Sequence, residues 1–408
     1  MESSRILVVS HLPILPATAG NKIRVWTLMN NLRAMGHDVW FLGLGLTPAE
    51  ELEIRKAWGD NLFIVPHVKA RHARPRLHAV KRWVLDRLIV KGWAPLNVDH
   101  RFWAHWDGAV RDIARREKFD VVIAEYVFCS KALTWFDSAI KVIDTHDVFT
   151  GRAKKLLASN ISRYDWNLSR AEEARGLLRA DLIIAIQKHE AAFFEELTGG
   201  ARRVCVVGHT VALRPLPAPA SAARNLLFVG TGNGPNVAGI NHFISRVMPL
   251  VLEKIPGARL HVAGSICKVI PPGAPGVELL GVVANLDEAY AGAAIVINPL
   301  LAGTGLKTKT VEALGHAKPL VTTACGAEGI EEAAGDAFLM ADEPAAMAAH
   351  ICRLIEAPAA AAALAARGFA FATAWNEAQL ATLGRIHLPP ATAVVPRRPR
   401  VSPPFARR

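Results

Sequence analysis

Several features that define other protein classes are missing from this chain of 408 residues. Its five cysteines, at positions 129, 205, 267, 325 and 352, form no CxxC pair, and their number is odd. This argues against both a zinc site and a disulfide framework, and it favours a reducing compartment. No apolar run reaches about 18 residues, so we expect neither a transmembrane helix nor a signal peptide. The chain is therefore expected to be cytoplasmic.

Acidic residues are too few to balance the basic ones, and the net charge is +12. The excess is confined to two segments: residues 69–91 contain eight Lys or Arg and one Asp, and residues 389–408 contain five Arg. The rest of the chain is balanced, so general affinity for nucleic acid is not expected. About half of the residues are apolar, which is typical of a globular protein.

The basic segment has two interpretations. Apolar residues recur at helical spacing between Leu77 and Ile89, basic residues flank them, and aromatic residues are frequent up to Trp106. Such a helix suits an anionic surface, so residues 69–106 are a candidate for peripheral contact with the inner face of the cytoplasmic membrane. The alternative is that the apolar face packs on the N-terminal part of the fold.

Short apolar runs alternate with helical or polar segments along most of the chain. They cover residues 6–10, 38–42, 121–124, 142–144, 182–185 and 204–207, and then 226–229, 260–263, 295–297 and 319–322. Buried parallel strands read as continuous apolar runs, and the alternation predicts helices on both faces of each sheet. We therefore expect an α/β fold of two Rossmann-like domains that face each other across a cleft.

Changes in composition give the domain boundaries. We expect an N-terminal domain over 1–210, a linker rich in Pro and Ala over 211–224, and a second domain over 225–365. Residues 366–388 are expected to form a C-terminal helix that packs back on the N-terminal domain. The basic tail over 389–408 is expected to be disordered.

The most informative stretch is Ala302–Glu312, in which Gly303 and Gly305 bracket a loop that leads into a helix. The first N–H groups of a helix have no partner within it, so phosphate binds there readily. A second glycine-rich loop, over 230–234, also follows a strand. It lacks the GxGxxG spacing, so we do not expect a nicotinamide or flavin cofactor. Its glycines would let the backbone approach a sugar or a phosphate.

These loops belong to a series of motifs with a familiar order and spacing. The motifs cover residues 227–230, 234–237, 298–299, 303–307, 312–314, 318–321 and 326–330. Together they resemble the nucleotide-sugar domain of retaining glycosyltransferases of the GT-B fold, specifically family 4. The N-terminal half resembles the same family more loosely, through residues 19–24 and 144–147.

The resemblance implies a nucleotide-diphosphate sugar as the donor and a glycan, lipid-linked or small-molecule acceptor on the N-terminal side. It implies catalytic roles for His146 at the transferred sugar and for Lys307 and Arg24 at the diphosphate. Donor contacts are implied for Gly20, Gly230, Thr231, Gly303, Thr304, Gly305, Leu306, Glu312 and Glu328. Among these, Glu312 would accept hydrogen bonds from the ribose hydroxyls.

The chain departs from the family pattern at three positions. Thr304 replaces the first Glu of the usual E-x7-E pair, and Thr231 and Asn236 stand where many relatives have Arg and Lys. This leaves Lys307 as the obvious cation of the second domain. No DxD-type acidic cluster is evident, so we expect no metal ion or other cofactor, with Lys307 and Arg24 replacing the ion.

Because of these departures, two alternatives to a glycosyltransferase stay open. The chain is a candidate for a non-catalytic protein that binds a sugar nucleotide or acts as a scaffold. It is also a candidate for another GT-B enzyme, such as a nucleotide-sugar epimerase, which would need its own acid and base residues.

Overall fold

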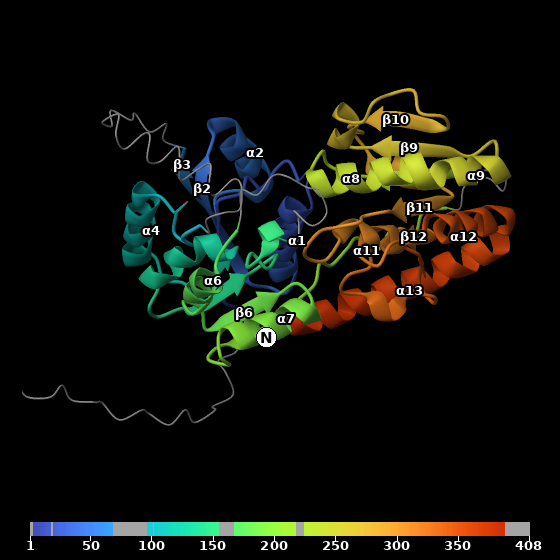
Figure 1. Ribbon diagram of the computed structural model, residues 1–408. Helices are drawn as coiled ribbons and strands as arrows, with labels where there is room; N and C mark the ends of the chain where they lie inside the picture. Colours follow the sequence, from blue (N-terminus) through green and yellow to red (C-terminus); the bar gives the residue numbers. More distant parts are fainter. Residues whose placement is uncertain are drawn as a thin grey trace, which may run out of the picture.

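The structure, a computed structural model, describes residues 3–17, 19–67, 96–100, 102–154, 167–217 and 224–387. It consists of two α/β domains that lie side by side, each built around one parallel sheet (Figure 1). This confirms the predicted fold class. The basic tail and most of the basic segment, including residues 69–91, lie outside the described residues.

The N-terminal sheet has seven strands in the order β3-β2-β1-β4-β5-β6-β7, all paired in parallel. The strands are β1 (Arg5–Ser10), β2 (Asp38–Leu46), β3 (Leu62–Pro66), β4 (Val121–Glu125), β5 (Ile140–Asp144), β6 (Leu182–Ala185) and β7 (Arg203–Val206). The order reverses between β1 and β4. In open parallel sheets such a point, at the carboxyl ends of the strands, is where ligands bind.

Helices cover both faces of this sheet. They are α1 (Gly20–Ala34), α2 (Pro48–Trp58), α4 (Ala104–Arg116), the 3-10 helix η1 (Val127–Trp135), α6 (Arg170–Leu177) and α7 (Lys188–Leu197). Alternate residues of β1 show the two faces: Leu7 and Val9 pack in one apolar core, and Ile6 and Val8 pack in the other.

The C-terminal sheet has six parallel strands in the order β10-β9-β8-β11-β12-β13. The strands are β8 (Asn225–Val229), β9 (Arg259–Ala263), β10 (Val277–Gly281), β11 (Ile295–Asn298), β12 (Leu320–Thr322) and β13 (Leu339–Met340). Its order reverses between β8 and β11. The loops that follow these two strands are the two glycine-rich loops of the sequence.

The helices of this domain also lie on both faces of its sheet. They are α8 (Gly234–His242), the π-helical segment η2 (Phe243–Val247), α9 (Met248–Lys254), η3 (Ser265–Lys268), α10 (Leu286–Ala291), α11 (Thr308–Gly315), η4 (Glu331–Ala333), α12 (Pro344–Glu356) and α13 (Pro358–Leu383). The linker residues 211–217 run along the end of α11, where Arg214 N donates to Gly315 O over 3.0 Å and Leu216 N donates to His316 O over 3.1 Å.

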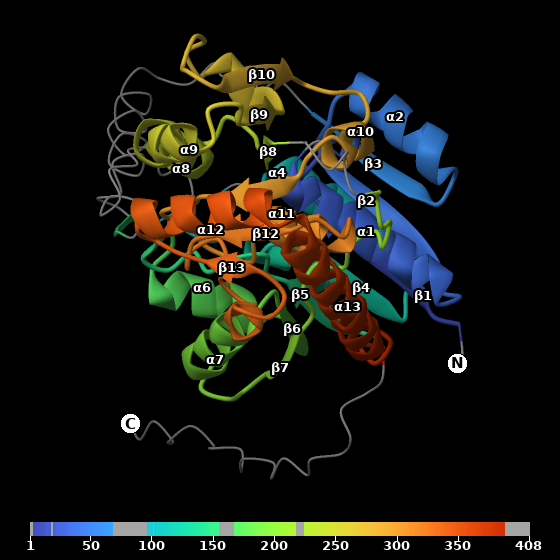
Figure 2. The ribbon, with the colours of Figure 1, turned by 90° about the vertical axis from the view of Figure 1, so that its right-hand side faces the viewer.

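The long helix α13 extends from the C-terminal domain onto the N-terminal domain (Figures 1 and 2). Near its end, Trp375 Nε1 donates to His209 O over 2.8 Å, and Gly208 N donates to the Gln379 side chain over 2.7 Å. Leu383 and Ile386 pack in the same core as β1. The expected boundary between 365 and 366 thus falls inside one continuous helix.

The described part of the 69–106 segment packs inward at two of its aromatic side chains. Phe102 and Trp106 are buried in the N-terminal core, whereas 37% of Trp103 is exposed. Among the described residues, no single helix is long and apolar enough to cross a bilayer. The pair α12 and α13 meets that test only when joined, and the two helices are bent by 107°.

Candidate functional site

The starts of two helices, one from each domain, face each other at the domain interface. A Cβ atom at Gly20, the first residue of α1, would lie 2.9 Å from Thr308 Oγ1 at the start of α11. Neither helix has an acidic residue in its first turn or a side chain that caps its N–H groups. By contrast, α2 and α8 begin with side-chain caps from Thr47 and Asn233. The positive ends of two helix dipoles therefore meet where the sequence predicts the diphosphate.

The loop that precedes α11 contacts the N-terminal domain directly. Gly305 has a φ of +74°, and a Cβ there would lie 3.0 Å from His146 O, so only glycine fits without strain. Thr304 Oγ1 donates to Asp147 Oδ2 over 2.9 Å. Asp147 also pairs with Arg152 at 3.2 Å. The first position of the E-x7-E pattern is therefore occupied by an uncharged threonine, which donates a hydrogen bond to a carboxylate of the other domain.

Lys307 lies at the N-cap of α11 and is buried. Its Nζ donates to Gly305 O and, over 2.9 Å, to Glu328 Oε2. The other oxygen of Glu328 accepts from Gln187 of the N-terminal domain over 3.4 Å. The structure thus brings two predicted donor-site residues, Lys307 and Glu328, into one ion pair.

A group of carboxylates surrounds this ion pair from the N-terminal side. Glu190 is buried, and burial together with the charges of Asp147 and Glu328 raises its pKa well above the usual range. Asp147 Oδ1 and Glu190 Oε2 are buried without a hydrogen-bond partner among the described residues. Buried acceptors of this kind are normally satisfied, so the pair is suited to receive hydroxyl donors from a ligand.

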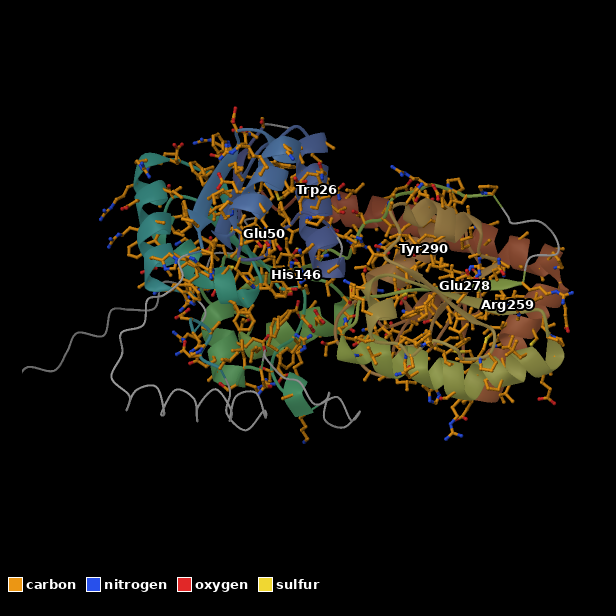
Figure 3. All side chains as sticks on the ribbon, turned by 90° about the horizontal axis from the view of Figure 1, so that it is seen from above. Trp26, Glu50, His146, Arg259, Glu278 and Tyr290 are labelled. Atoms are coloured by element: carbon orange, nitrogen blue, oxygen red, sulfur yellow. The ribbon has the colours of Figure 1, made fainter. Side chains whose placement is uncertain are left out.

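His146 lies on the side of the N-terminal domain that faces the C-terminal domain (Figure 3). Its Nε2 is 2.5 Å from Glu125 Oε2 and 3.4 Å from Asp144 Oδ2. Its ring stacks on Tyr126, with centroids 4.1 Å apart. Both aromatic residues have positive φ angles, +59° for His146 and +64° for Tyr126. Non-glycine residues with such strained backbone angles are most frequent at functional sites.

Arg24 has different partners from those that the sequence suggests. Its Nε and Nη2 donate to the two oxygens of Asp144 over 2.9 and 2.6 Å, and Nη2 also donates to Val207 O over 2.9 Å. Both side chains of the pair are buried. The sequence places this guanidinium at the diphosphate, whereas in the structure it neutralises the carboxylate of Asp144, which lies 3.4 Å from His146 Nε2. The structure therefore supports Arg24 as a positioning residue.

Glu312 and the 230–233 loop complete the predicted donor site. Glu312 lies one turn after Thr308, 22% of its side chain is exposed, and burial raises the pKa of its carboxyl group. Gly230 has no room for a side chain, because a Cβ there would lie 2.8 Å from the Phe228 ring. Thr231 is held by Asn236 Nδ2, which donates to its carbonyl oxygen over 2.9 Å.

Comparisons with known proteins agree with this architecture. Residues 223–357 match the family model described as glycosyl transferases group 1. An uncharacterised 44.6 kDa protein in the cps region of Klebsiella pneumoniae is 24% identical over 382 residues, which cover 85% of this chain and 90% of that protein.

Solved structures similar to this chain cover almost its whole length. Sucrose-phosphate synthase from Thermosynechococcus elongatus has a TM-score of 0.68 at 16% identity and covers 94% of this chain and 98% of its own. HepE from Anabaena, solved with UDP-glucose, has a TM-score of 0.59 at 15% identity, with coverages of 93% and 99%. TarM from S. aureus, solved with UDP and α-GlcNAc-glycerol, has a TM-score of 0.66 at 9% identity, with coverages of 95% and 100%.

The chain has the GT-B fold. Together with the match over 223–357, this fold supports a glycosyltransferase that uses a nucleotide sugar. The predicted site residues all lie at the carboxyl ends of strands, close to the points where the strand order reverses. Each one is in the loop that follows a strand or in the helix after that loop. Arg24 differs from the role predicted for it, because its positive charge is paired with the carboxylate of Asp144.

Within the described part of this GT-B chain, one group of side chains has the composition and spacing of a metal site. The ligand atoms of Glu125, Asp144 and His146 lie within 4.8 Å of one another. Arg24 already donates to both oxygens of Asp144 and supplies a positive charge there. The guanidinium therefore competes with a cation for the same oxygens.

Sequence reasoning missed several residues of the site. Glu125 ends the apolar run of β4, and its place at the carboxyl end of a predicted strand was a usable signal. Tyr126, Gln187 and Glu190 carried no such signal, because their importance depends on contacts across the fold. A further omission is Lys309, which lies at the start of α11 beside Asn236.

Proposed function

We propose that this protein is a retaining glycosyltransferase of the family 4 type. It transfers a hexosyl group from a nucleoside-diphosphate sugar to a hydroxyl of a glycan, lipid-linked or small-molecule acceptor. The observation that carries the proposal is the meeting of Gly20 and Thr308, which directs two uncapped helix starts at one place beside Lys307. An anion with the size of a diphosphate suits that place.

The similar proteins make the donor and the pathway more specific. HepE and TarM have been solved with UDP or UDP-glucose, so uridine nucleotides are the first donors to test. The Klebsiella relative comes from a cps region. We therefore infer that the product belongs to a capsule or another cell-envelope polysaccharide.

In the proposed reaction, the bond between the anomeric carbon and the β-phosphate oxygen breaks while the acceptor oxygen bonds to the same face of that carbon. The configuration is retained because the new bond forms on the face from which the phosphate departs, and the acceptor proton passes to that phosphate. Lys307 and the amides at the start of α11 stabilise the negative charge that develops on the phosphate. No step needs a metal ion, because these positive groups act on the charge directly.

The remaining polar groups orient the donor. Glu312 accepts from the ribose hydroxyls, and the loop of Gly230 and Thr231 approaches the phosphates. On the other side, His146 and the unpaired oxygens of Asp147 and Glu190 contact the sugar hydroxyls. These acceptors lie on the N-terminal domain, so the sugar is placed between the two domains.

The test is a screen of nucleotide sugars by thermal shift on the purified protein, followed by turnover with the best donor. We expect Lys307→Ala to lower kcat/KM at least about 100-fold, as for removal of other groups that stabilise transition-state charge. Glu312→Ala removes charge-assisted hydrogen bonds to the ribose and should lower kcat/KM by about 10- to 100-fold. Lys254→Ala, at an exposed position of α9, is the matched control. NMR of the product determines whether the anomeric configuration is retained. Unchanged turnover in both variants would rule out this site.

Two other outcomes distinguish the alternatives. A sugar nucleotide that changes without any acceptor points to an epimerase. Calorimetric binding without hydrolysis or transfer at any protein concentration points to a non-catalytic binding protein, which the pairing of Lys307 with Glu328 favours.

A further inference from the structure

Lys309 provides a second cation at the start of α11. Its Nζ donates to Asn236 Oδ1 over 2.7 Å and lies 4.4 Å from the centroid of the Phe228 ring. Lys307 is the N-cap residue of α11 and Lys309 is its second residue, and the two side chains have different partners. Lys307 faces Glu328, whereas Lys309 faces β8 and α8.

The partner of Lys309 is part of the support for the 230–233 loop. Asn236 Nδ2 donates to Thr231 O over 2.9 Å, and Asn236 N donates to the side chain of Asn233 over 2.9 Å. The Lys309 ammonium is therefore held at the glycine-rich loop after β8.

The charge of Lys309 is not neutralised by its direct contact. Asn236 is uncharged, and among the described residues no carboxylate lies within ion-pair distance of the Lys309 ammonium. Glu312, one turn later on α11, acts on it only at longer range. Burial lowers the pKa of Lys309 to about 7. A partly buried ammonium without a counterion is costly, and an arriving anion would offset that cost.

We propose that Lys309 is a second phosphate-binding residue of the donor site and contacts the nucleotide diphosphate from the side of the 230–233 loop. Its ammonium group provides a positive charge next to Asn236 and the Thr231 loop, whose side chains are uncharged. Lys307 binds the diphosphate from the other side of the start of α11. This inference rests on the proposed function, because it assumes that a nucleotide diphosphate occupies the interface.

The competing explanation is structural: Lys309 only fixes Asn236 and the loop. Calorimetry separates the two. The affinities of a nucleoside diphosphate and of the matching nucleoside monophosphate are measured, with the nucleoside chosen by the thermal-shift screen. We expect Lys309→Gln, which keeps a hydrogen-bond donor for Asn236 but has no charge, to weaken diphosphate binding about 10- to 100-fold. Monophosphate binding should change much less.

An exchange variant tests the position of the charge. Lys309→Gln combined with Asn236→Lys returns the ammonium to the same place from α8, and we expect it to recover most of the diphosphate affinity. Lys254→Gln is the control for loss of a charge elsewhere in the domain. Thermal unfolding of each variant confirms folding, and Lys309→Met is the second neutral variant.

Three results would overturn the inference. Unchanged diphosphate affinity in Lys309→Gln and Lys309→Met would remove Lys309 from the site. Equal weakening of both nucleotides, without recovery in the exchange variant, would assign it a structural role. If the unmodified protein binds no nucleoside diphosphate, the proposed function itself fails, and the Lys309 inference fails with it.

Discussion

The guanidinium of Arg24 and the carboxylate of Asp144 form an ion pair in which both side chains are buried. Asp144 ends β5 and needs a countercharge, because an unpaired buried carboxylate costs several kcal/mol. The family motifs identify both residues, but nothing in the sequence shows that they pair, since 120 positions separate them. The guanidinium of Arg24, which the sequence places at the diphosphate, is therefore paired with the carboxylate next to His146.

Tyr126 positions His146 by stacking on its ring. We predict that Tyr126→Ala lowers kcat up to about 10-fold, the equivalent of a stacking contribution near 1 kcal/mol, while the donor KM changes little. Tyr126→Phe keeps the ring and should retain nearly full activity. Steady-state kinetics with the best donor measures both. A loss in Tyr126→Phe as large as that in Tyr126→Ala would instead assign the effect to the hydroxyl group.

Glu190 makes the stability of the fold depend on pH. Its pKa is raised in the folded state, so between the unfolded pKa and the folded pKa the native protein binds more protons than the unfolded chain. This group therefore makes the free energy of unfolding fall as the pH rises through that window, by up to about 1.4 kcal/mol per pH unit.

We predict that Glu190→Gln flattens this decline and stabilises the protein at neutral pH. Urea unfolding at several pH values from 4 to 8 measures the effect. Glu195→Gln, at an exposed position of the same helix, should leave the pH dependence unchanged. A variant at position 190 that declines as steeply as the unmodified protein would contradict the prediction.

At the scale of elements, the central strands were predictable and most of the edge strands were not. β1, β4, β5, β8 and β11 are buried on both faces and read as apolar runs. β3, β10 and β13 lie at sheet edges and were missed, because they are more exposed and β13 has two residues, whereas the edge strand β7 coincides with the predicted run 204–207. The Ala-rich region is helical as expected, but Pro358 begins a second helix there, at its favoured first position.

The end of α13 is attached to the linker by one side chain. Asn376 accepts from Val211 N over 3.0 Å and donates to Val211 O over 2.7 Å. We predict that Asn376→Ala lowers the free energy of unfolding by about 2 kcal/mol, because it leaves buried backbone groups unpaired. Denaturant unfolding measures this, with the exposed Glu377→Ala as control. Equal stability of the two variants would show that water replaces the lost bonds.

At the scale of the whole molecule, the site depends on contacts between domains that no local pattern describes. The loop of Thr304 and Gly305 and the helix α11 that follows it, with Glu312, could be predicted, because they follow one another in a continuous motif. The partners of that loop, Asp147 and Glu190, come from distant parts of the chain. Only the packing of one domain on the other identifies them.

The contact between Thr304 and Asp147 leads to a prediction opposite to the family pattern. Thr304→Glu restores the usual E-x7-E pair but places a second carboxylate beside Asp147. Charges about 4 Å apart interact by about 1 to 4 kcal/mol at a protein surface, so we expect a fall in kcat/KM of about 10-fold or more. Asp147→Asn in the same chain should recover part of the loss.

Donor turnover is measured for Thr304→Glu and for the double variant Thr304→Glu with Asp147→Asn. A loss in the first and a partial recovery in the second would confirm the prediction. An increase in turnover for Thr304→Glu alone would mean that the glutamate reaches the sugar without disturbing the interface. In that case the contact between Thr304 and Asp147 would not be needed for activity.

The path of α13 also has a consequence for biosynthesis. The N-terminal sheet is complete at the end of β7, yet the core beneath α1 is completed by Leu383 and Ile386, which are synthesised only after the sheet of the C-terminal domain. Domains generally begin to fold as they emerge from the ribosome. During translation, the apolar surface that Leu383 and Ile386 cover therefore stays exposed to solvent. It is buried only after α13, the last helix, has been synthesised.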